Sequence, residues 1–282
     1  MLAAPVTFQF ASDLHLEALL RTWPDARIIT PHPKADALIL AGDIACIHDI
    51  GALFGDWPVP VFHVPGNHEY YGLDMAHERR QLRRTSKVGA VQVLDDAGAV
   101  FKGVRILGST LWTDYRLHPA LGLPAAKAAA QVCMVGADFA AIRHEGHLLG
   151  PAQVLELHAQ SAAWLREELG HPFTGPTLVV THHAPSRASL PPRWAHTSSA
   201  VAFASDLPHL LSKATAWVHG HLHNAVEHRA YGCLVLANPR GYARALPLAD
   251  RPEDLSFENP DFEPARLVTL WPGSRRVSTD EE

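Results

Sequence analysis

Cysteine is scarce in this chain, with Cys46, Cys133 and Cys233 as the only thiols among 282 residues. An odd number of scattered cysteines argues against a disulfide framework and against a thiolate metal knuckle. Long apolar runs are missing as well, since no stretch approaches the roughly 18 residues of a membrane span. The amino terminus lacks the cationic and apolar segments of a signal peptide. We therefore expect a soluble, cytoplasmic protein that does not associate with membranes.

Charge of one sign is not in large excess. Charged residues make up 19% of the chain, and the formal net charge is −5. Such a balance provides no basic field, so we expect no obligatory nucleic-acid partner. Histidine, by contrast, is abundant, with 19 residues against 19 glycines. Either many of these histidines lie on the surface or some of them are metal ligands.

Short apolar runs that end in polar residues recur along the chain and indicate strands. They are enriched in β-branched residues and bounded by Gly, Pro or Asn. The runs are VTFQFASDLH, ADALILAGDI, VPVFHVPGNHE, VRILGSTLWTDY, PTLVVTHHAP, TAWVHGHLH, CLVLANPRGY and ARLVTLWP. Helical composition at residues 75–84 and helical spacing of apolar residues at 153–169 predict helices between them. Strands that alternate with helices predict an α/β layered fold.

The length is suited to one large domain, and we expect a single domain over residues 1–282. The Ala-rich region 117–150 is less regular, which indicates an insertion and a candidate lid. The polar tail at 275–282 is expected to fray.

Five of the predicted strands end on residues that bind metals or transfer protons. These residues are Asp13, His15, Asp43, Asn67, His68, Glu69, His182, His183, His221 and His223. Taken alone, the alternating histidines of VHGHLH at 218–223 could be the polar face of a half-buried strand. Five such strand ends can instead converge in one crevice, because ligand sites of open α/β sheets lie beyond the carboxyl ends of the strands.

The donors in this set are carboxylate oxygens, an amide oxygen and imidazole nitrogens, without a thiolate. They suit divalent Mn, Fe, Co, Ni or Zn and disfavour Cu(I) or an iron–sulfur cluster. The set also exceeds what one tetrahedral ion needs. We therefore predict two divalent transition-metal ions that share a bridging carboxylate, with Mn favoured.

Five motifs stand in a fixed order: DxH at residues 13–15, GD at 42–43, GNHE at 66–69, a lone downstream His182, and GHxH at 220–223. In this order they resemble the calcineurin-like metallophosphoesterase superfamily, and the match covers most of the chain. A GSTLWTDY-like and an ANPRGY-like strand are similar to an uncharacterised bacterial branch of it. The resemblance implies a four-layer α-β-β-α sandwich, in which two facing mixed sheets are flanked by helices.

The resemblance also implies a role for each motif residue. Asp13, His15, Asp43 and His223 would hold one ion, and Asp43, Asn67, His182 and His221 would hold the other. A hydroxide that bridges the ions together with Asp43 then attacks phosphorus in line. His68 would bind neither ion and would protonate or stabilise the leaving alkoxide, hydrogen-bonded by a carboxylate such as Asp13 or Glu69.

Further residues are candidates for substrate contact or for support of the ligands. They are Glu69, Tyr70, His183, Arg143 and Arg240. Tyr70 and its neighbour Tyr71 could form a substrate wall, and arginine forks suit phosphate oxygens. Packing or surface exposure is the alternative for each.

These observations predict a hydrolase of small phosphate esters, with a phosphodiesterase slightly favoured over a phosphomonoesterase. A nuclease or nucleotide phosphatase on the same site is the alternative, although the acidic charge balance disfavours a nuclease. An inactive protein-binding scaffold on this fold is a further alternative, but such proteins lose ligands and none is missing here. The oligomeric state is left open.

Overall fold

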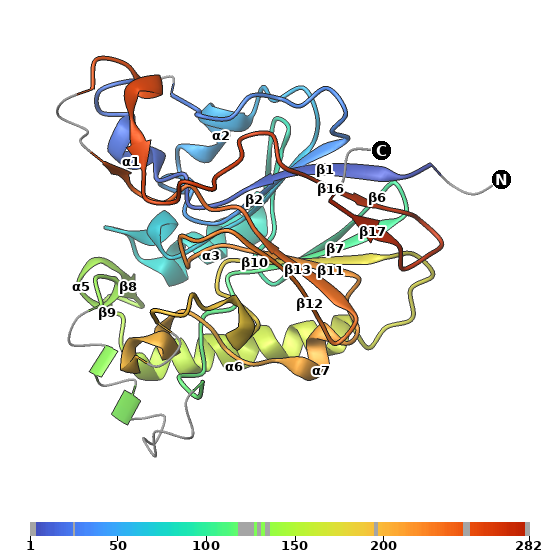
Figure 1. Ribbon diagram of the computed structural model, residues 1–282. Helices are drawn as coiled ribbons and strands as arrows, with labels where there is room; N and C mark the ends of the chain where they lie inside the picture. Colours follow the sequence, from blue (N-terminus) through green and yellow to red (C-terminus); the bar gives the residue numbers. More distant parts are fainter. Residues whose placement is uncertain are drawn as a thin grey trace.

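The computed structural model describes residues 4–24, 26–117, 127–128, 131–132, 136–194, 197–244 and 249–279. Two large mixed sheets face each other, and helices cover their outer sides (Figure 1). This arrangement confirms the predicted α/β sandwich of four layers.

Within the described residues, the first sheet has seven strands in the order β17-β16-β1-β2-β3-β5-β4. Strands β1, β2, β3 and β5 run parallel, so their carboxyl ends lie at one edge. The strands are β1 (Val6–Ala11), β2 (Ala37–Ala41), β3 (Val61–Val64), β4 (Lys87–Val88), β5 (Val91–Val93), β16 (Leu267–Leu270) and β17 (Val277–Ser278).

The second sheet has six strands in the order β12-β13-β11-β10-β7-β6 over the same part of the chain. Its four central strands are parallel, and the two edge strands are antiparallel to their neighbours. The strands are β6 (Ala97–Phe101), β7 (Val104–Ser109), β10 (Thr177–Thr181), β11 (Ala216–His219), β12 (Val226–Ala230) and β13 (Cys233–Ala237). Two small two-stranded sheets pair β8 (Arg143–His144) with β9 (His147–Leu148) and β14 (Ala243–Arg244) with β15 (Ser256–Phe257).

The main core lies between the two sheets. Apolar side chains from both inner faces, among them Phe8, Ile39, Ile106 and Val180, form one buried cluster. Helices α1 (Leu16–Leu19) and α2 (Ile50–Phe54) cover the outer face of the first sheet, and α6 (Pro151–Glu168) and α7 (Pro208–Leu211) cover that of the second (Figure 1). Helices α3 (Met75–Arg84) and α5 (Asp138–Ala141) lie on the side where the parallel strands end.

Each of the eight predicted apolar runs contains a strand, and both predicted helices are present as α3 and α6. Helix α6 begins two residues earlier than predicted, because Pro151 occupies its first turn, where a missing N–H costs nothing. The sequence pattern did not reveal the strands β4, β5, β6 and β12. They are short or half exposed, so they lack a continuous apolar run.

The carboxyl-terminal tail and the predicted insertion are described only in part. The prediction of a frayed tail is wrong for Val277–Ser278, because this segment pairs with β16 and buries Val277. Residues 280–282, Cys133 and much of the predicted insertion at 117–150 lie outside the described residues. The described part of the insertion forms α5 and the hairpin β8–β9. The single domain and the lid stay predictions.

Candidate metal centre

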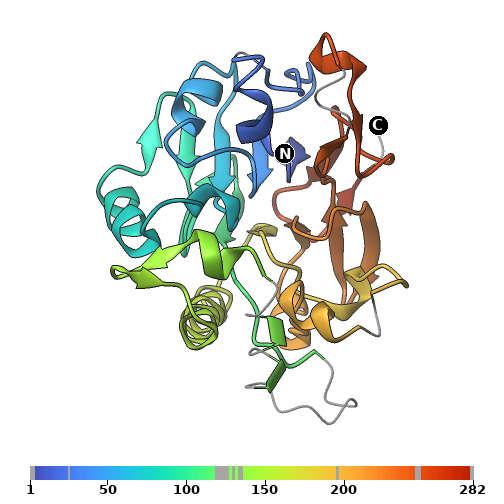
Figure 2. The same cartoon turned by 90° about the vertical axis from the view of Figure 1, so that its left-hand side faces the viewer.

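The predicted ligands lie together where parallel strands end. Asp13 and His15 follow β1, Asp43 follows β2, Asn67 follows β3, His182 follows β10, and His221 and His223 follow β11. Figure 2 looks onto this edge, where the ends of both sheets meet. Strands from two sheets therefore supply one cluster of donors.

One group of donors consists of Asp13, His15 and His223. The Nε2 atoms of His15 and His223 are 3.2 Å apart. His223 Nε2 lies 3.3 Å from Asp13 Oδ1. All three donor atoms are thus close enough to bind one ion.

A second group is arranged around His182. Its Nε2 atom lies 3.0 Å from Asn67 Oδ1, 3.1 Å from His221 Nδ1 and 3.3 Å from Asp43 Oδ2. Metal–ligand bonds of about 2.1 Å put neighbouring ligand atoms about 3.0 Å apart in an octahedron and about 3.4 Å apart in a tetrahedron. The spacings in both groups fall in this interval.

The protonation of the imidazoles also fits cations. Three of them donate a hydrogen bond through Nδ1 to an oxygen outside the cluster. The pairs are His15 with Glu17 (3.1 Å), His182 with Ala41 (3.0 Å) and His223 with Glu258 (2.7 Å). With Nδ1 protonated, each Nε2 presents a lone pair to the other acceptors of its group. A cation between them turns this repulsion into attraction, so the residues present fit divalent metal ions.

The loops that carry the ligands adopt unusual backbone conformations. Positive φ angles occur at Asp13 (51°), His15 (44°), Asp43 (55°), His221 (70°) and His223 (49°). Such strain in residues other than glycine is typical of functional sites, where the surrounding structure supports it. At Gly220, a Cβ atom would lie 2.6 Å from Asp13 Oδ2, so the GHxH loop can approach this carboxylate only with glycine.

His68 lies beside the donors, and its ring is held on three sides. Its Nδ1 atom is 3.2 Å from Glu17 Oε1, and its Nε2 atom is 3.0 Å from the Tyr242 hydroxyl. The ring stacks on Tyr71 at a centroid distance of 4.0 Å. Burial opposes protonation, but the charges of Asp43 and Glu17 outweigh it and raise the pKa of His68 to about 9. The partner carboxylate is Glu17, so the expectation of Asp13 or Glu69 in this role was wrong.

Glu69 supports the loops and has no access to a substrate. Its side chain is fully buried and accepts hydrogen bonds from the backbone N–H groups of Asp43 (2.9 Å), Ile44 (2.8 Å) and Gly66 (2.7 Å). It thereby joins the GD loop to the GNHE loop. The carboxylate positions two ligand loops through their backbone.

Tyr70 and His183 are buried behind the site. Tyr70 has no exposed surface and packs in an apolar cluster, so it forms no substrate wall, whereas Tyr71 contacts His68. The His183 ring lies 4.2 Å from that of His221, and its Nδ1 atom is 3.2 Å from the Thr110 carbonyl oxygen. Burial lowers the pKa of His183 to about 3, so its ring is neutral and supports a ligand.

The two arginines predicted to bind phosphate point elsewhere. Arg143 is exposed on β8 and donates to the Gly146 carbonyl within its own hairpin. Arg240 has no exposed surface, donates to the Leu14 carbonyl, and lies 4.5 Å from the centre of the Phe257 ring. Neither arginine is free to bind phosphate in this arrangement, but Arg240 supports the DxH loop through the Leu14 carbonyl, in agreement with the alternative of ligand support.

Four residues of the site were not found from the sequence. They are Glu17, Asp138, Tyr242 and Glu258. Asp138 accepts hydrogen bonds from Asn67 Nδ2 and from the Tyr71 hydroxyl, both at 2.7 Å. A carboxylate two residues after His15 was a usable signal for Glu17, and Tyr242 ends the ANPRGY segment of a predicted strand. Nothing in the sequence pattern marked Asp138 and Glu258.

Comparisons with known proteins identify the family and the fold. A family model for calcineurin-like phosphoesterases matches residues 6–225. The structure of phosphopantetheinyl hydrolase (PptH) from Mycobacterium tuberculosis is similar, with a TM-score of 0.66 and 21% identity, over 92% of this chain and 98% of that chain. A dimetal phosphatase from Danio rerio has a TM-score of 0.45 and 14% identity, with 96% of each chain covered. Uncharacterized protein L509 of Acanthamoeba polyphaga mimivirus is 21% identical over 201 residues, which are 65% of this chain and 68% of that protein.

The sandwich fold and the clustered donors define a metal-dependent hydrolase of phosphate esters. The family model spans most of the chain, and the chain belongs to the calcineurin-like phosphoesterase family. The family implies a binuclear divalent metal centre and a small phosphorylated substrate, so this protein is a binuclear metal-dependent phosphoesterase. Among the described helices, none has the length and apolar character to cross a membrane.

Proposed function

We propose that the clustered donors bind two ions as two sets that share Asp43. One set is Asp13, His15, Asp43 and His223, and the other is Asp43, Asn67, His182 and His221. The support is the position of Asp43 between the groups. It lies within 4.8 Å of donor atoms of His15 and His68, and equally of donor atoms of His182 and His221.

We propose Mn as the favoured ion, with Fe, Zn, Co or Ni as alternatives. The donors combine carboxylate and amide oxygens with imidazole nitrogens, a mixture that suits these ions. Loading the metal-free protein separately with each ion, followed by measurement of metal content and turnover, tests this proposal. A higher turnover with another ion at equal metal content would contradict it.

We propose further that the substrate is a phosphodiester. When bound, two divalent ions supply positive charge to the phosphoryl oxygens and lower the pKa of a nucleophilic water. The remaining task is the protonation of the leaving alkoxide. The surroundings of His68 are the observation that carries this proposal.

His68 is built to donate a proton. Glu17 and Asp43 favour its protonated form, which raises its pKa to about 9. Its Nε2 atom points toward the hydroxyl of Tyr242, a residue that is 44% exposed, so a leaving group can reach this position from solvent. An acid at this position benefits a diester with a poor alkoxide leaving group most.

The positions of Arg143 and Arg240 also favour a phosphodiester over a phosphomonoester as the substrate. Arg143 donates within its own hairpin, and Arg240 is buried and donates to the Leu14 carbonyl. An arginine clamp would favour the doubly charged phosphate of a monoester. A diester carries a single negative charge and needs no such clamp.

Turnover of bis(p-nitrophenyl) phosphate and of p-nitrophenyl phosphate tests the preference. We expect a higher kcat/KM for the diester, and a higher value for the monoester would overturn the proposal. His68→Ala should lower turnover of alkyl diesters by about 100- to 10,000-fold and that of activated aryl diesters far less. Equal losses on both would count against the acid role. His48→Ala, which changes an exposed histidine paired with Glu78, is the control.

Other substrates belong in the same panel. Cyclic nucleotides, nucleoside monophosphates and single-stranded DNA test the nucleotide phosphatase and nuclease alternatives. The similar structure from Mycobacterium tuberculosis is described as a phosphopantetheinyl hydrolase, so phosphopantetheinyl diesters are included. Metal binding without turnover of any ester would favour the scaffold alternative.

A further inference from the structure

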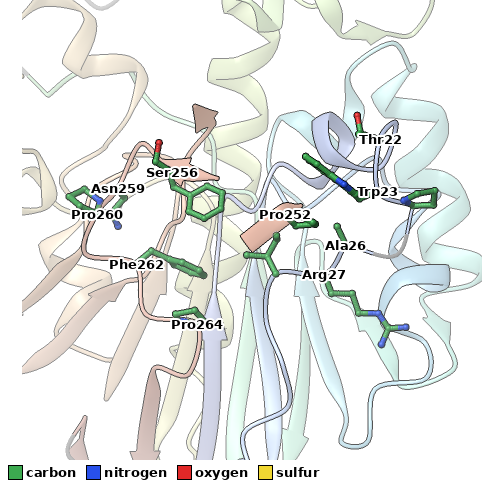
Figure 3. A pocket seen from close by; sticks show the side chains of 13 residues that line it. Thr22, Trp23, Ala26, Arg27, Pro252, Ser256, Asn259, Pro260, Phe262 and Pro264 are labelled. Atoms are coloured by element: carbon green, nitrogen blue, oxygen red, sulfur yellow. The ribbon is translucent and has the colours of Figure 1, made fainter. Parts of the chain in front are cut away.

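A cavity of about 880 Å³ lies between two segments that are far apart in the sequence. Trp23 and Ala26, which follow α1, lie on one side, and Ser256 and Phe262 lie on the other (Figure 3). Phe257 also lines the cavity. Four prolines complete much of the wall. The volume is in the range of about 300–1,000 Å³ that is typical of small-molecule sites.

The larger polar groups of the wall are already engaged. The Arg27 guanidinium lies 2.9 Å from an Asp56 carboxylate oxygen. The Asn259 side chain donates to the Pro239 carbonyl at 2.6 Å and accepts from the Asp261 N–H at 3.2 Å. A nucleobase or a sugar needs free hydrogen-bond partners, whereas rings of Trp, Phe and Pro suit an apolar group. The wall therefore favours an apolar ligand.

Each side of the cavity is joined to the metal centre through a carboxylate. Glu17, which contacts the proposed acid at 3.2 Å, lies on α1 shortly before Trp23. Glu258 directly follows Phe257 and accepts a hydrogen bond from His223 at 2.7 Å. Figure 2 shows α1 and the orange-red segment around residue 252 side by side on the face that carries the donors. The two segments that line the cavity therefore also carry the carboxylates that contact His68 and His223.

We propose that this cavity binds an apolar alkyl or aryl group of the substrate's alcohol while the metal centre binds the phosphoryl group. The inference rests on the proposed function and narrows its substrate class to phosphoesters with an extended apolar substituent. Such a ligand buries hydrocarbon against Trp23, Phe257 and Phe262, and each buried CH₂ group strengthens binding.

Calorimetric titration of the metal-loaded protein with methylphosphonate and hexylphosphonate tests the inference without any turnover. We expect hexylphosphonate to bind at least about tenfold more tightly. Ser256→Trp places an indole at the exposed rim of the cavity, and Phe262→Ala removes part of its wall. In both variants the ratio of the two affinities should fall toward one.

Ser274→Trp, which adds the same ring at an exposed position outside the cavity, should retain the preference for hexylphosphonate. Equal affinities in the unchanged protein, or an unchanged preference in both cavity variants, would overturn the inference. The proposed function has its own test: it is wrong if the metal-loaded protein hydrolyses neither a phosphodiester nor a phosphomonoester. Because binding and turnover are measured independently, the two failures are distinguishable.

Discussion

Asp138 holds the Asn67 amide in one orientation. The Nδ2 group of Asn67 donates to Asp138 Oδ1 at 2.7 Å, which leaves Asn67 Oδ1 facing His182 Nε2 at 3.0 Å. An amide can rotate by half a turn and present its NH₂ group instead, which repels a cation. A residue of the predicted insertion therefore selects the end of Asn67 that can bind metal.

Asp138→Ala should accordingly weaken the binding of one of the two ions about 10- to 100-fold. Asp138→Asn retains an acceptor oxygen for the Asn67 amide and should restore most of the affinity. Metal titration calorimetry, with metal content after dialysis, measures both effects. Equal losses in the two variants would show that shape or charge, not the acceptor oxygen, is what matters.

Asp43→Asn should remove both ions, because Asp43 lies between the two groups of donors. We expect turnover to fall by more than about a hundredfold, since changes of groups outside the ligand set already cost 10- to 100-fold. Atomic emission measurement of bound metal, alongside turnover, checks this. Asp261→Asn, at an exposed aspartate away from the donors, is the matched control. A variant with two bound ions and full activity would contradict the shared role of Asp43.

The decline of turnover at alkaline pH should reflect the loss of the proton that His68 shares with Glu17. Burial opposes ionisation of Glu17, but hydrogen bonds from His15 and His68 lower its pKa to about 2, so its charge persists at neutral pH. This charge helps to raise the pKa of His68, so activity should fall at alkaline pH as His68 loses its proton. In Glu17→Gln the pKa of His68 decreases, and the alkaline decline should begin about one pH unit lower.

Glu258→Gln provides the comparison for this profile. Glu258 contacts His223 and not His68. The loss of its charge should therefore change metal affinity, while the pH at which kcat declines on the alkaline side should stay the same. Steady-state kcat measured between pH 6 and 10 distinguishes the two variants. If the alkaline decline of kcat shifts equally in Glu17→Gln and Glu258→Gln, then the decline reflects ionisation at the metal centre rather than at His68.

Buried neutral histidines should make the fold sensitive to acid. Burial lowers the pKa of His63 on β3 to about 3, against about 6.5 in an unfolded chain. The unfolded state therefore binds the proton first. The stability from this group is complete above about pH 6.5 and declines as the pH falls toward 3, by about 2 kcal/mol at pH 5.

When the pH falls from 7.5 to 5, the free energy of unfolding of the unchanged protein should decrease. The decrease should be about 2 kcal/mol smaller for His63→Leu. Phe62→Leu, which changes a buried neighbour that does not titrate, should leave the pH dependence unchanged. Urea unfolding at both pH values measures the difference. An identical pH dependence of the His63 variant and the unchanged protein would contradict the prediction.

The local motifs were readable because each follows a strand directly. Residues next to a strand end inherit their position from the strand, so Asp13, Asp43 and His182 could be placed at one edge without any structure. The same reasoning does not extend to Arg240, which lies three residues beyond the end of β13. Gly241 has a φ angle of 75°, which breaks the alternation of side chains. Arg240, before this turn, lies in the interior, and Tyr242, after it, contacts His68.

Glu258 and Asp138 could not be predicted in the same way. Glu258 lies 35 residues from His223 and Asp138 lies 71 residues from Asn67, and neither belongs to a run with a regular period. The packing of the loops around them decides which carboxylate reaches which ligand. No local pattern encodes such a contact, since it depends on the path of the whole chain.

The amino-acid sequence by itself determined the layered α/β fold, the edge at which the donors meet and the kinds of atom they offer. Apolar periodicity sets the strands, and residue chemistry sets the donors. Only the tertiary structure decided which carboxylates orient the donors and His68, that Tyr70 and Arg240 are buried, and that an apolar cavity lies between the segments around Trp23 and Phe262. These features arise where loops from distant parts of the chain pack against one another, and their contacts minimise the free energy of the whole fold rather than of any one segment.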